Sequence, residues 1–272
     1  MNYVEVTFVV NPLLPARDIL VAELAERGFE SFVETDNGLM AYIQEPDFSE
    51  EKLTNLALGE EQLTITHQLI QEQNWNAEWE KSFDPIEVDE RIVVRAPFHE
   101  IKEVEFDIVI EPKMSFGTGH HATTFLMMQE MLGMEWTDKD VLDMGCGTAV
   151  LAILAEMKGA DYIVAIDIDE WAYENSIENV ERNNCTRIKC IKGGAEAIGE
   201  QSFDIILANI NRNILTADAA TYMAALNPGG EILLSGFYTM DIPILLQSFP
   251  HLTELRRHER NDWAMVHLTL PK

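Results

Sequence analysis

The chain has 272 residues, of which 47% are hydrophobic, and its 47 acidic residues outnumber 19 basic ones to give a formal net charge of −28. This apolar content is enough for a sizeable core in one large domain or two small ones, and no run approaches the 18 uncharged apolar residues of a membrane span. The acidic balance argues against direct nucleic-acid binding and favours a basic partner, although acids that only keep the protein soluble would give the same balance.

The first seventy residues or so alternate strand-like and helix-like patterns of hydrophobicity. An Asp-Asn-Gly turn separates two strands near their middle, and Ser49 is the expected N-cap of a second helix. The patterns predict, in chain order, a strand at residues 3–10, a helix at 14–29, two strands within 31–44, a helix at 49–58 and a strand at 63–71. The order βαββαβ predicts a small ferredoxin-like α+β domain over residues 1–73, with its helices on one face of the sheet.

Residues 74–90 interrupt this alternation with two tryptophans, a proline and many charges. Trp75 and Trp79 would share one face of a helix, where packing between domains is favoured over ligand stacking. We therefore predict a short helical linker here, followed by a second domain over residues 91–272.

The second domain repeats strand and helix patterns, which are typical of an α/β fold with a doubly wound, mostly parallel sheet. Its last segment, residues 252–270, has the pattern of an antiparallel hairpin, so the sheet is expected to end mixed. Strands are expected within residues 140–160, 162–169, 203–210 and 230–237, and helices over 123–132 and 214–226.

The segment DMGCGTAV follows an apolar strand and places Gly145 and Gly147 in a tight turn before a helix. Glycines let a ligand approach the backbone, and the helix that follows presents free N–H groups, so the pattern indicates a nucleotide site. The dinucleotide fingerprint would need a third glycine at the position of Val150. With the acid Asp143 before it and the small Ala149 after it, the turn looks instead like the first motif of S-adenosylmethionine-dependent methyltransferases.

Two further polar residues stand at predicted strand ends. Asp167 ends the strand after the glycine turn, where a carboxylate can accept hydrogen bonds from both ribose hydroxyls. Dehydrogenases use an acid there too, and an ordinary exposed acid at a strand end is the structural alternative. Asn209 ends a later strand, at a place where many methyltransferases of amino groups have Asn or Asp followed by prolines and an aromatic residue. Only the first residue of that pattern is present here.

The stretch MSFGTGHHATT, residues 114–124, concentrates glycine, histidine and threonine ahead of a helix. An ordinary loop leading into a helix cap is one alternative, and a metal site at His120 and His121 is another. Adjacent histidines rarely point at one ion and no third ligand stands at the right spacing, so no metal is expected. The stretch resembles the F-G-T-G-x-H-x-T-T segment of the bacterial family that methylates large-subunit ribosomal protein eleven (PrmA-type). The likeness extends to WEKSF, GCG, AIDID, ENVERN and ANI, and it covers nearly the whole chain.

This resemblance implies a fold, a cofactor and a set of contacts. The fold is a seven-stranded, Rossmann-like methyltransferase sheet with a small leading domain, and the cofactor is S-adenosylmethionine, with S-adenosylhomocysteine as the product. Cofactor contacts are expected from Phe116, Gly117, Thr118, Gly119, Thr124, Asp143, Gly145, Gly147, Asp167 and Asn209, the first four as a loop that folds over the cofactor. Asn209 is also the expected catalytic residue, because it would orient the nucleophilic nitrogen.

The resemblance also implies repeated methylation of lysine and N-terminal amino groups on a basic ribosomal protein, a partner that the acidic balance favours as well. A methyltransferase of the same fold acting on another protein or on a small-molecule amine is one alternative, and a non-catalytic sensor of an adenosine ligand is another. Asn209 and the covering loop argue against the sensor, whereas the leading domain argues against a small-molecule enzyme.

The N-terminus and the cysteines indicate the compartment. Glu5 stands where a secretory signal would carry a basic region before its apolar stretch. The three cysteines, Cys146, Cys185 and Cys190, are odd in number and lack the paired spacing of a zinc site. We therefore expect a cytoplasmic protein without disulfides, and we take a monomer as the expected state.

Overall fold

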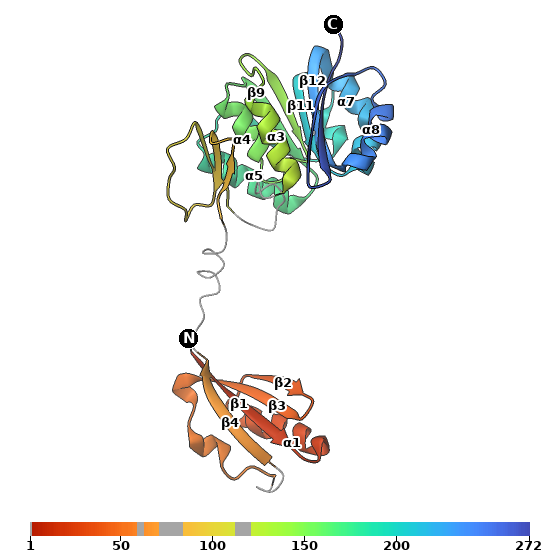
Figure 1. Ribbon diagram of the computed structural model, residues 1–272. Helices are drawn as coiled ribbons and strands as arrows, with labels where there is room; N and C mark the ends of the chain where they lie inside the picture. Colours follow the sequence, from red (N-terminus) through yellow and green to blue (C-terminus); the bar gives the residue numbers. More distant parts are fainter. Residues whose placement is uncertain (1, 59–62, 71–83, 112–120) are drawn as a thin grey trace. The chain divides into compact units, whose positions relative to one another are not determined.

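The computed structural model describes residues 2–58, 63–70, 84–111 and 121–272. Contacts within the chain divide it into two compact units, Met1–Ser82 and Phe83–Lys272 (Figure 1). The expected linker tryptophans, Trp75 and Trp79, lie outside the described residues. Each unit is built around a core of its own.

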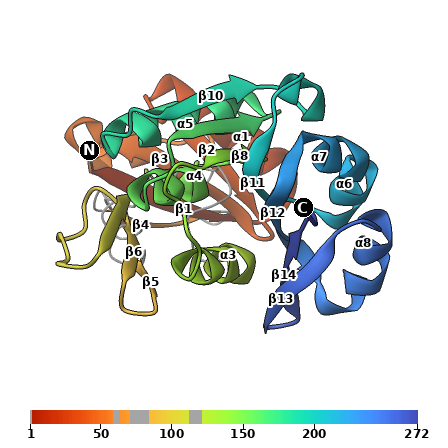
Figure 2. The same cartoon turned by 90° about the horizontal axis from the view of Figure 1, so that it is seen from above.

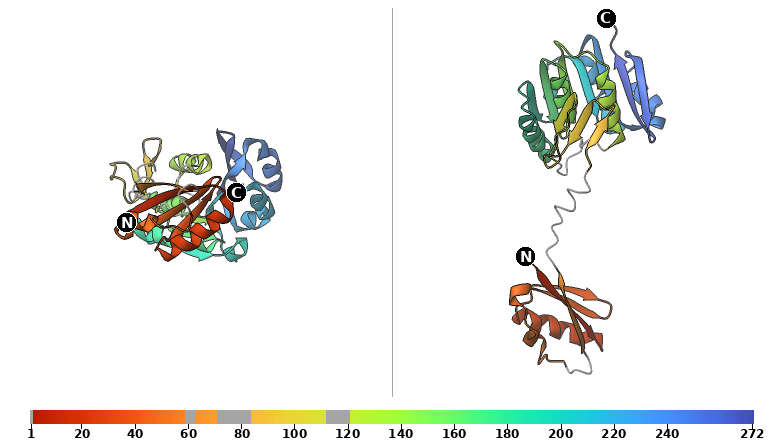
Figure 3. Two further views of the ribbon diagram at one scale, coloured as in Figure 1. Left: turned by 90° about the horizontal axis from the view of Figure 1, so that it is seen from below. Right: turned by 60° about the vertical axis from the view of Figure 1, so that its left-hand side comes forward.

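The described residues of the first unit form a four-stranded antiparallel sheet with one helix on a face (Figure 3, right-hand panel). Its elements are β1 (Tyr3–Val10), α1 (Leu13–Glu26), β2 (Ser31–Thr35), β3 (Gly38–Gln44) and β4 (Leu63–Ile70), and the strand order is β2-β3-β1-β4. Alternate residues of β1, such as Val6 and Phe8, are buried with Leu20 and Leu24 of α1. This order and pairing are those of a ferredoxin-like sheet, as the sequence predicts.

The expected second helix of this unit, over residues 49–58, is wrong. The segment contains one short 3₁₀ turn, η2 (Glu50–Leu53), which follows another, η1 (Glu45–Asp47), and Ser49 makes no side-chain capping bond. Asn55 adopts a left-handed conformation with φ +53°, which a continuing α-helix cannot contain. The leucines of this segment pack against the core without a helix.

The second unit contains a mostly parallel sheet whose described strands number seven. They are β8 (Asp140–Met144), β9 (Tyr162–Asp167), β10 (Ile188–Lys192), β11 (Phe203–Asn209), β12 (Leu226–Tyr238), β13 (Thr253–Arg260) and β14 (Trp263–Thr269), in the order β10-β9-β8-β11-β12-β14-β13. Only β14 is antiparallel to both of its neighbours among these strands. The chain order reverses between β8 and β11, and ligands bind at the carboxyl ends of strands at such a switch point.

Helices cover both faces of this sheet. On one face lie α3 (Ala122–Leu132), α4 (Val150–Met157) and α5 (Glu170–Arg182), and on the other lie α6 (Arg212–Ala217), α7 (Ala219–Ala225) and α8 (Ile242–Ser248). Figure 2 shows β12 and β14 between α3 and α8. Because side chains alternate along a strand, Val141 joins the core on the first face and Leu142 the core on the second.

The single helix expected over residues 214–226 is wrong in detail, because two short helices meet there. Asp218 lies between α6 and α7 with φ −96° and ψ 3°, outside helical geometry. Its backbone carbonyl accepts hydrogen bonds from the N–H groups of Thr221 and Tyr222, so it caps the second helix as the first one ends.

A small sheet precedes α3, with strands β5 (Ile86–Val88), β6 (Ile92–Arg95) and β7 (Phe106–Val109). Its buried side chains share the core of α3 and α4. Asn183, the C-cap residue of α5, holds the end of β7, since its side-chain amide exchanges two hydrogen bonds with the backbone of Val109. Strand β5 lies within residues 74–90, where the sequence analysis expects a linker.

Glu130 anchors α3 to the antiparallel part of the sheet. Its carboxylate, 2% exposed, accepts hydrogen bonds from His267 Nδ1 at 2.7 Å and from His258 Nε2 at 2.8 Å. The other ring nitrogen of His267 donates to Glu231 at 2.8 Å. Burial opposes the charge of His267, but these two carboxylates outweigh it and raise its pKa. Burial likewise opposes the charge of Glu130, and its histidine partners more than compensate, so its pKa is lowered.

No helix in the described ranges combines the length and the apolar character needed to cross a membrane.

Candidate active site

The glycine turn lies against the end of β11. Gly145 has φ +68°, and a Cβ atom placed on it would lie 2.1 Å from Ile210 Cγ2. The backbone N–H groups of Gly145 and Cys146 both donate to the carbonyl of Ile166 on β9. The turn is therefore fixed between the ends of three neighbouring strands, at a position that only glycine fits.

Asp167 ends β9 beside this turn, and its carboxylate is already positioned by the backbone. One oxygen accepts from the N–H of Gly147 at 2.8 Å, and the other accepts from the N–H of Asp169 at 2.9 Å. Each carboxylate oxygen has capacity for a further bond, so a ligand can still donate to it. Asp169 in turn caps α5 by accepting from the N–H groups of Trp171 and Ala172.

Asn209 ends β11 and is joined to the first turn of α3. Its Nδ2 donates to the Oγ1 of Thr124 at 3.1 Å, and Thr124 is fully buried. The other amide atom, Oδ1, is buried and has no hydrogen-bond partner within the described residues. Buried polar atoms are almost always paired in folded proteins, so this oxygen is positioned to accept from a ligand N–H or O–H group.

His121 precedes α3 and caps it, with its Nδ1 2.8 Å from Thr123 Oγ1. Burial lowers the pKa of this imidazole below its ordinary value, so the ring is neutral at pH 7. Its ring contacts that of Trp263 edge to face, with centroids 4.5 Å apart at 74°. Clusters of three or more His, Cys, Asp or Glu side chains able to hold a metal are absent from the described part of the chain.

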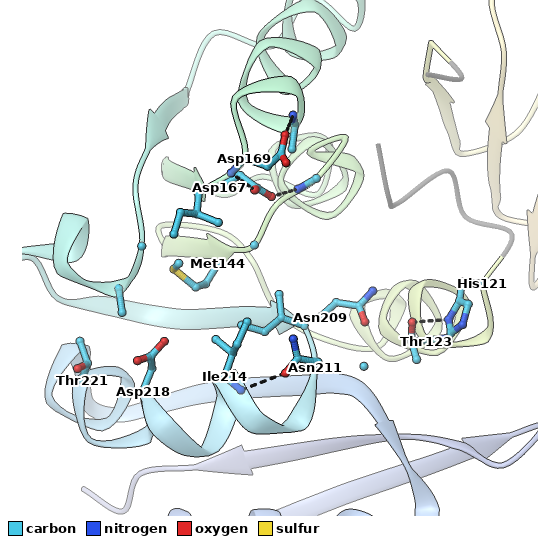
Figure 4. Close-up of a pocket in the computed structure, with 18 of the residues that line it drawn as sticks. His121, Thr123, Met144, Asp167, Asp169, Asn209, Asn211, Ile214, Asp218 and Thr221 are labelled. Carbon is cyan, nitrogen blue, oxygen red and sulfur yellow. Dashed lines mark hydrogen bonds between the residues drawn. The ribbon is translucent and has the colours of Figure 1, made fainter. Parts of the chain in front are cut away.

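These residues border one pocket of about 1400 Å³ at the carboxyl ends of the parallel strands. In the view of Figure 4, His121 and Thr123 lie at one end of it, and Asp218 and Thr221 at the other. Of the residues expected from the sequence, the pocket is lined by Gly145, Gly147, Asp167 and Asn209. Thr124 and Asp143 instead border a small cavity of about 10 Å³ next to it. Phe116, Gly117, Thr118 and Gly119 fall outside the described residues.

Asp143 is fully enclosed beneath the glycine turn. Its Oδ2 accepts from the backbone N–H of Ala152 in the first turn of α4, at 3.1 Å. Burial raises the pKa of this carboxyl to about 7. In this position Asp143 supports the start of α4 and thereby the turn, while Asp167 provides the carboxylate at the pocket surface.

Several pocket residues were missed by the sequence analysis. The pocket is also lined by Trp171, Glu196, Asp218, Gly236 and Trp263. Of these five residues, Gly236 is the one that the sequence could most directly have pointed to, because its position requires glycine: φ is +93°, and there is no room for a Cβ beside the backbone of Ile210. Four acids line the pocket, and neither lysine nor arginine is among its lining residues in the described part of the chain. Such a lining attracts cations and repels phosphates.

Comparison with known proteins agrees with this geometry. The family model described as "Ribosomal protein L11 methyltransferase (PrmA)" matches residues 16–270. A ribosomal protein L11 methyltransferase of Bacteroides fragilis is 46% identical over 99% of this chain and 100% of its own length. One of Chlorobaculum tepidum is 36% identical over 100% of this chain and 97% of its own length.

A solved structure shares the fold. The crystal structure of a ribosomal protein L11 methylase from Lactobacillus delbrueckii subsp. bulgaricus superposes with a TM-score of 0.64 at 23% identity, and the match covers 70% of this chain and 100% of that one. The family and the fold expected from the sequence are thus confirmed. The chain belongs to the ribosomal protein L11 methyltransferase (PrmA) family and is an S-adenosylmethionine-dependent protein methyltransferase.

Proposed function

We propose that this chain transfers methyl groups from S-adenosylmethionine to lysine and N-terminal amino groups of ribosomal protein L11, in the cytoplasm. The observation that carries the proposal is the buried Oδ1 of Asn209, which lies at the switch point of the sheet and lacks a hydrogen-bond partner among the residues that the structure describes. An acceptor in this position suits an amine, which brings an N–H donor and must be held with its lone pair in one direction.

The residues around Asn209 fit the methyl donor, whose sulfonium supplies an activated methyl group when bound. The carboxylate of Asp167 has oxygens available for two ribose hydroxyls, and the turn at Gly145 and Gly147 brings the backbone close to the ligand. Thr124 would support this end of the site through Asn209. The acidic lining suits the positive charge on sulfur. Residues 116–119 are the proposed covering loop.

The protein's main task is then to deliver a neutral amine in line with the methyl group. For a lysine with pKa 10.4, deprotonation at pH 7 costs about 4.6 kcal/mol, against about 1 kcal/mol for an α-amino group of pKa near 7.7 to 8.0. Desolvation in the pocket favours the neutral amine, whereas the nearby acids oppose deprotonation. The Oδ1 of Asn209 contributes orientation, because its hydrogen bond to an N–H of the amine fixes the direction of the lone pair.

The first unit, with residues 1–73 as a recognition domain and 74–90 as a linker, has substrate binding as its proposed role. It has a core of its own, and the described residues that line the pocket all belong to the second unit. A basic ribosomal protein is the partner that a net charge of −28 attracts, so its association should slow as salt screens this attraction over about 8 to 10 Å.

The test incubates the full chain with S-adenosylmethionine and ribosomal protein L11 and follows the substrate mass. Asn209→Ala should lower the turnover number far more than it weakens S-adenosylhomocysteine binding in calorimetry, since orientation acts in the transition state. Asn211→Ser is the matched control, because it keeps an N-cap acceptor for Ile214 while it changes a neighbouring pocket asparagine. Absence of methyl transfer to L11 by the unaltered chain would rule the proposal out.

A further inference from the structure

We infer that Trp263, held between His121 and Tyr238, forms an aromatic wall that binds the methylated ammonium of the substrate and lets the same amine be methylated repeatedly. The inference rests on the proposed function, because it concerns the amine that Asn209 receives. It gives a role to these aromatic residues, to which the proposed function assigns none.

The ring of Trp263 is fixed from two directions. Trp263 begins β14 and is paired with Tyr238 at the end of β12, and their rings lie 4.2 Å apart, tilted by 31°. His121 meets the indole edge to face at 4.5 Å. On the same hairpin, Arg260 stacks over the ring of Phe125 at 3.7 Å and so ties the hairpin to α3. The indole is only partly buried and borders the pocket, so a ligand can reach it and bind with little further loss of freedom.

This aromatic wall lies in the same pocket as the amine acceptor. Asn209 is hydrogen-bonded to Thr124, His121 caps the helix that carries Thr124, and His121 contacts Trp263. Asn209, His121 and Trp263 all line the pocket. Asp167 and Trp171 line it as well, and they flank the cap of α5 where the ribose is proposed to bind. The aromatic wall is therefore assigned to the substrate end.

The chemistry of successive methylation explains why two kinds of contact are needed. In each transfer an N–C bond forms as the C–S bond breaks, sulfur keeps the electron pair, and the nitrogen releases a proton to solvent before the next transfer. Each round replaces one N–H by N–CH₃, so the amine has fewer N–H groups that can donate to Asn209 and finally has none. The third transfer leaves a quaternary cation that has no proton to lose.

An aromatic face binds such a cation without any N–H group. The negative face of an indole attracts alkylammonium ions, and tryptophan is the most favourable residue for this contact. The site adds no positive charge from His121, because burial lowers the pKa of that imidazole. The contact grows in relative importance as methyl groups accumulate, so Trp263 should act most strongly on the later methylation states.

The first experiment measures binding by calorimetry to the full chain saturated with S-adenosylhomocysteine. Three lysine peptides of one sequence are compared: unmodified, trimethylated, and carrying a neutral tert-butyl group in place of the trimethylammonium. The unaltered chain should bind the trimethylated peptide several-fold more tightly than the neutral analogue, because the ring face and the acidic lining both attract only the cation. Equal affinity would overturn the inference, and this comparison needs no substituted protein.

The second experiment changes the ring. Trp263→Leu should weaken binding of the trimethylated peptide by about 3- to 30-fold and that of the more strongly hydrated unmodified peptide less, while Trp263→Phe retains most of the affinity. In reactions with L11, the Leu variant should accumulate monomethyl and dimethyl products. Tyr162→Leu is the control, since this exposed aromatic residue begins β9, lies outside the pocket lining and should leave the product ratio unchanged.

The outcomes separate the inference from the function on which it rests. If the unaltered chain does not methylate L11, the proposed function fails, whereas the peptide comparison still tests the aromatic wall. If the unaltered chain methylates L11 and a folded Trp263→Leu variant gives the same products and the same trimethyl affinity, the inference alone is wrong.

Discussion

Asn209 and Thr124, separated by 85 positions in the sequence, are joined by a 3.1 Å hydrogen bond from the amide Nδ2 to the hydroxyl Oγ1. Because the nitrogen is engaged by Thr124, the oxygen of the same amide must point away from it, and this is the atom without a partner among the described residues. The start of α3 therefore decides which atom of Asn209 faces a ligand. Turnover should depend on Thr124 even though its side chain does not line the large pocket.

Thr124→Val should lower the turnover number, because the amide of Asn209 loses the partner that fixes its orientation. It should also destabilise the fold by about 1 to 3 kcal/mol, the cost of a buried donor without a partner. Thr124→Ser, which restores the hydroxyl, should recover most of both losses. Steady-state kinetics and urea unfolding of the two variants check this; equal activity of the Val and Ser variants would show that the hydrogen bond does not position Asn209.

Gly145→Ala should abolish cofactor binding and destabilise the protein. The positive φ costs about 1 to 2 kcal/mol for a residue with a Cβ, and the contact with Ile210 Cγ2 adds about 1 to 3 kcal/mol. Gly159→Ala provides the control, since Gly159 also has a positive φ but its Cβ would meet only Thr137 at 3.8 Å. Adding Ile210→Ala to Gly145→Ala should restore part of the stability, as measured by thermal unfolding. No recovery in the double variant would show that the contact with Ile210 does not cause the loss.

Asp143 should make the protein less stable as pH rises towards neutrality. Burial raises the pKa of its carboxyl from 3.8 to about 7, so the folded state holds the proton more tightly than the unfolded state does. Its contribution is complete below pH 3.8 and is lost progressively as pH approaches 7. Asp143→Asn, which keeps an acceptor for Ala152, should remove this slope in urea unfolding between pH 4 and 6.5, below the range in which His267 loses its proton. An unchanged slope would show that another group titrates there.

The cluster of Glu130, His258, His267 and Glu231 should lower the stability of the protein at both acidic and alkaline pH, and its acidic effect is opposite to that of Asp143. The pKa of Glu130 is lowered, so its contribution is present above pH 4.5 and is lost as pH falls through the lowered value. The pKa of His267 is raised, so its contribution is present below pH 6.5 and is lost as pH rises through the raised value. Glu231, His258 and Arg256 also face these two groups.

The change that tests this cluster is His267→Gln. It keeps a hydrogen-bond donor for Glu130 and cannot titrate, so it should remove the loss of stability above pH 6.5 and leave the loss below pH 4.5 in place. Unfolding curves of the variant and the unaltered chain at matched pH values provide the comparison. A persistent alkaline slope in the variant would assign that slope to a different residue.

The boundary between the units predicts which fragment can fold. Residues 83–272 retain β5, whose Val88 is fully buried in the core of α3, and they retain the hydrogen bonds from Gln129 to Asp89. Residues 91–272 lack this strand and lose the burial of Val88, worth about 1.5 to 3 kcal/mol. The longer fragment should bind S-adenosylhomocysteine with the affinity of the full chain, and the shorter one should melt at a lower temperature. Identical melting temperatures would show that β5 is dispensable.

Much of the site could be predicted from the sequence because its residues lie at the carboxyl ends of strands. Gly145, Asp167 and Asn209 each follow an apolar strand, and parallel strands bring their carboxyl ends to one edge, so local patterns were enough to group them. Trp263 was not predictable in this way, because it lies in an antiparallel hairpin whose approach to His121 depends on tertiary packing. A helix was expected after Ser49 because a suitable cap was present, but the extended Thr54 and the left-handed Asn55 end it after one turn.

The four acids in the pocket, Asp167, Asp169, Glu196 and Asp218, have a consequence for exchange between reaction cycles. Methyl transfer removes the positive charge from sulfur, so the spent molecule carries one positive charge less than the fresh one. A negatively charged lining attracts the fresh molecule more strongly than the spent one. After each transfer the product is therefore held more weakly than the methyl donor. The acidic lining thus favours exchange of the product for a fresh donor molecule before the next methyl group is added.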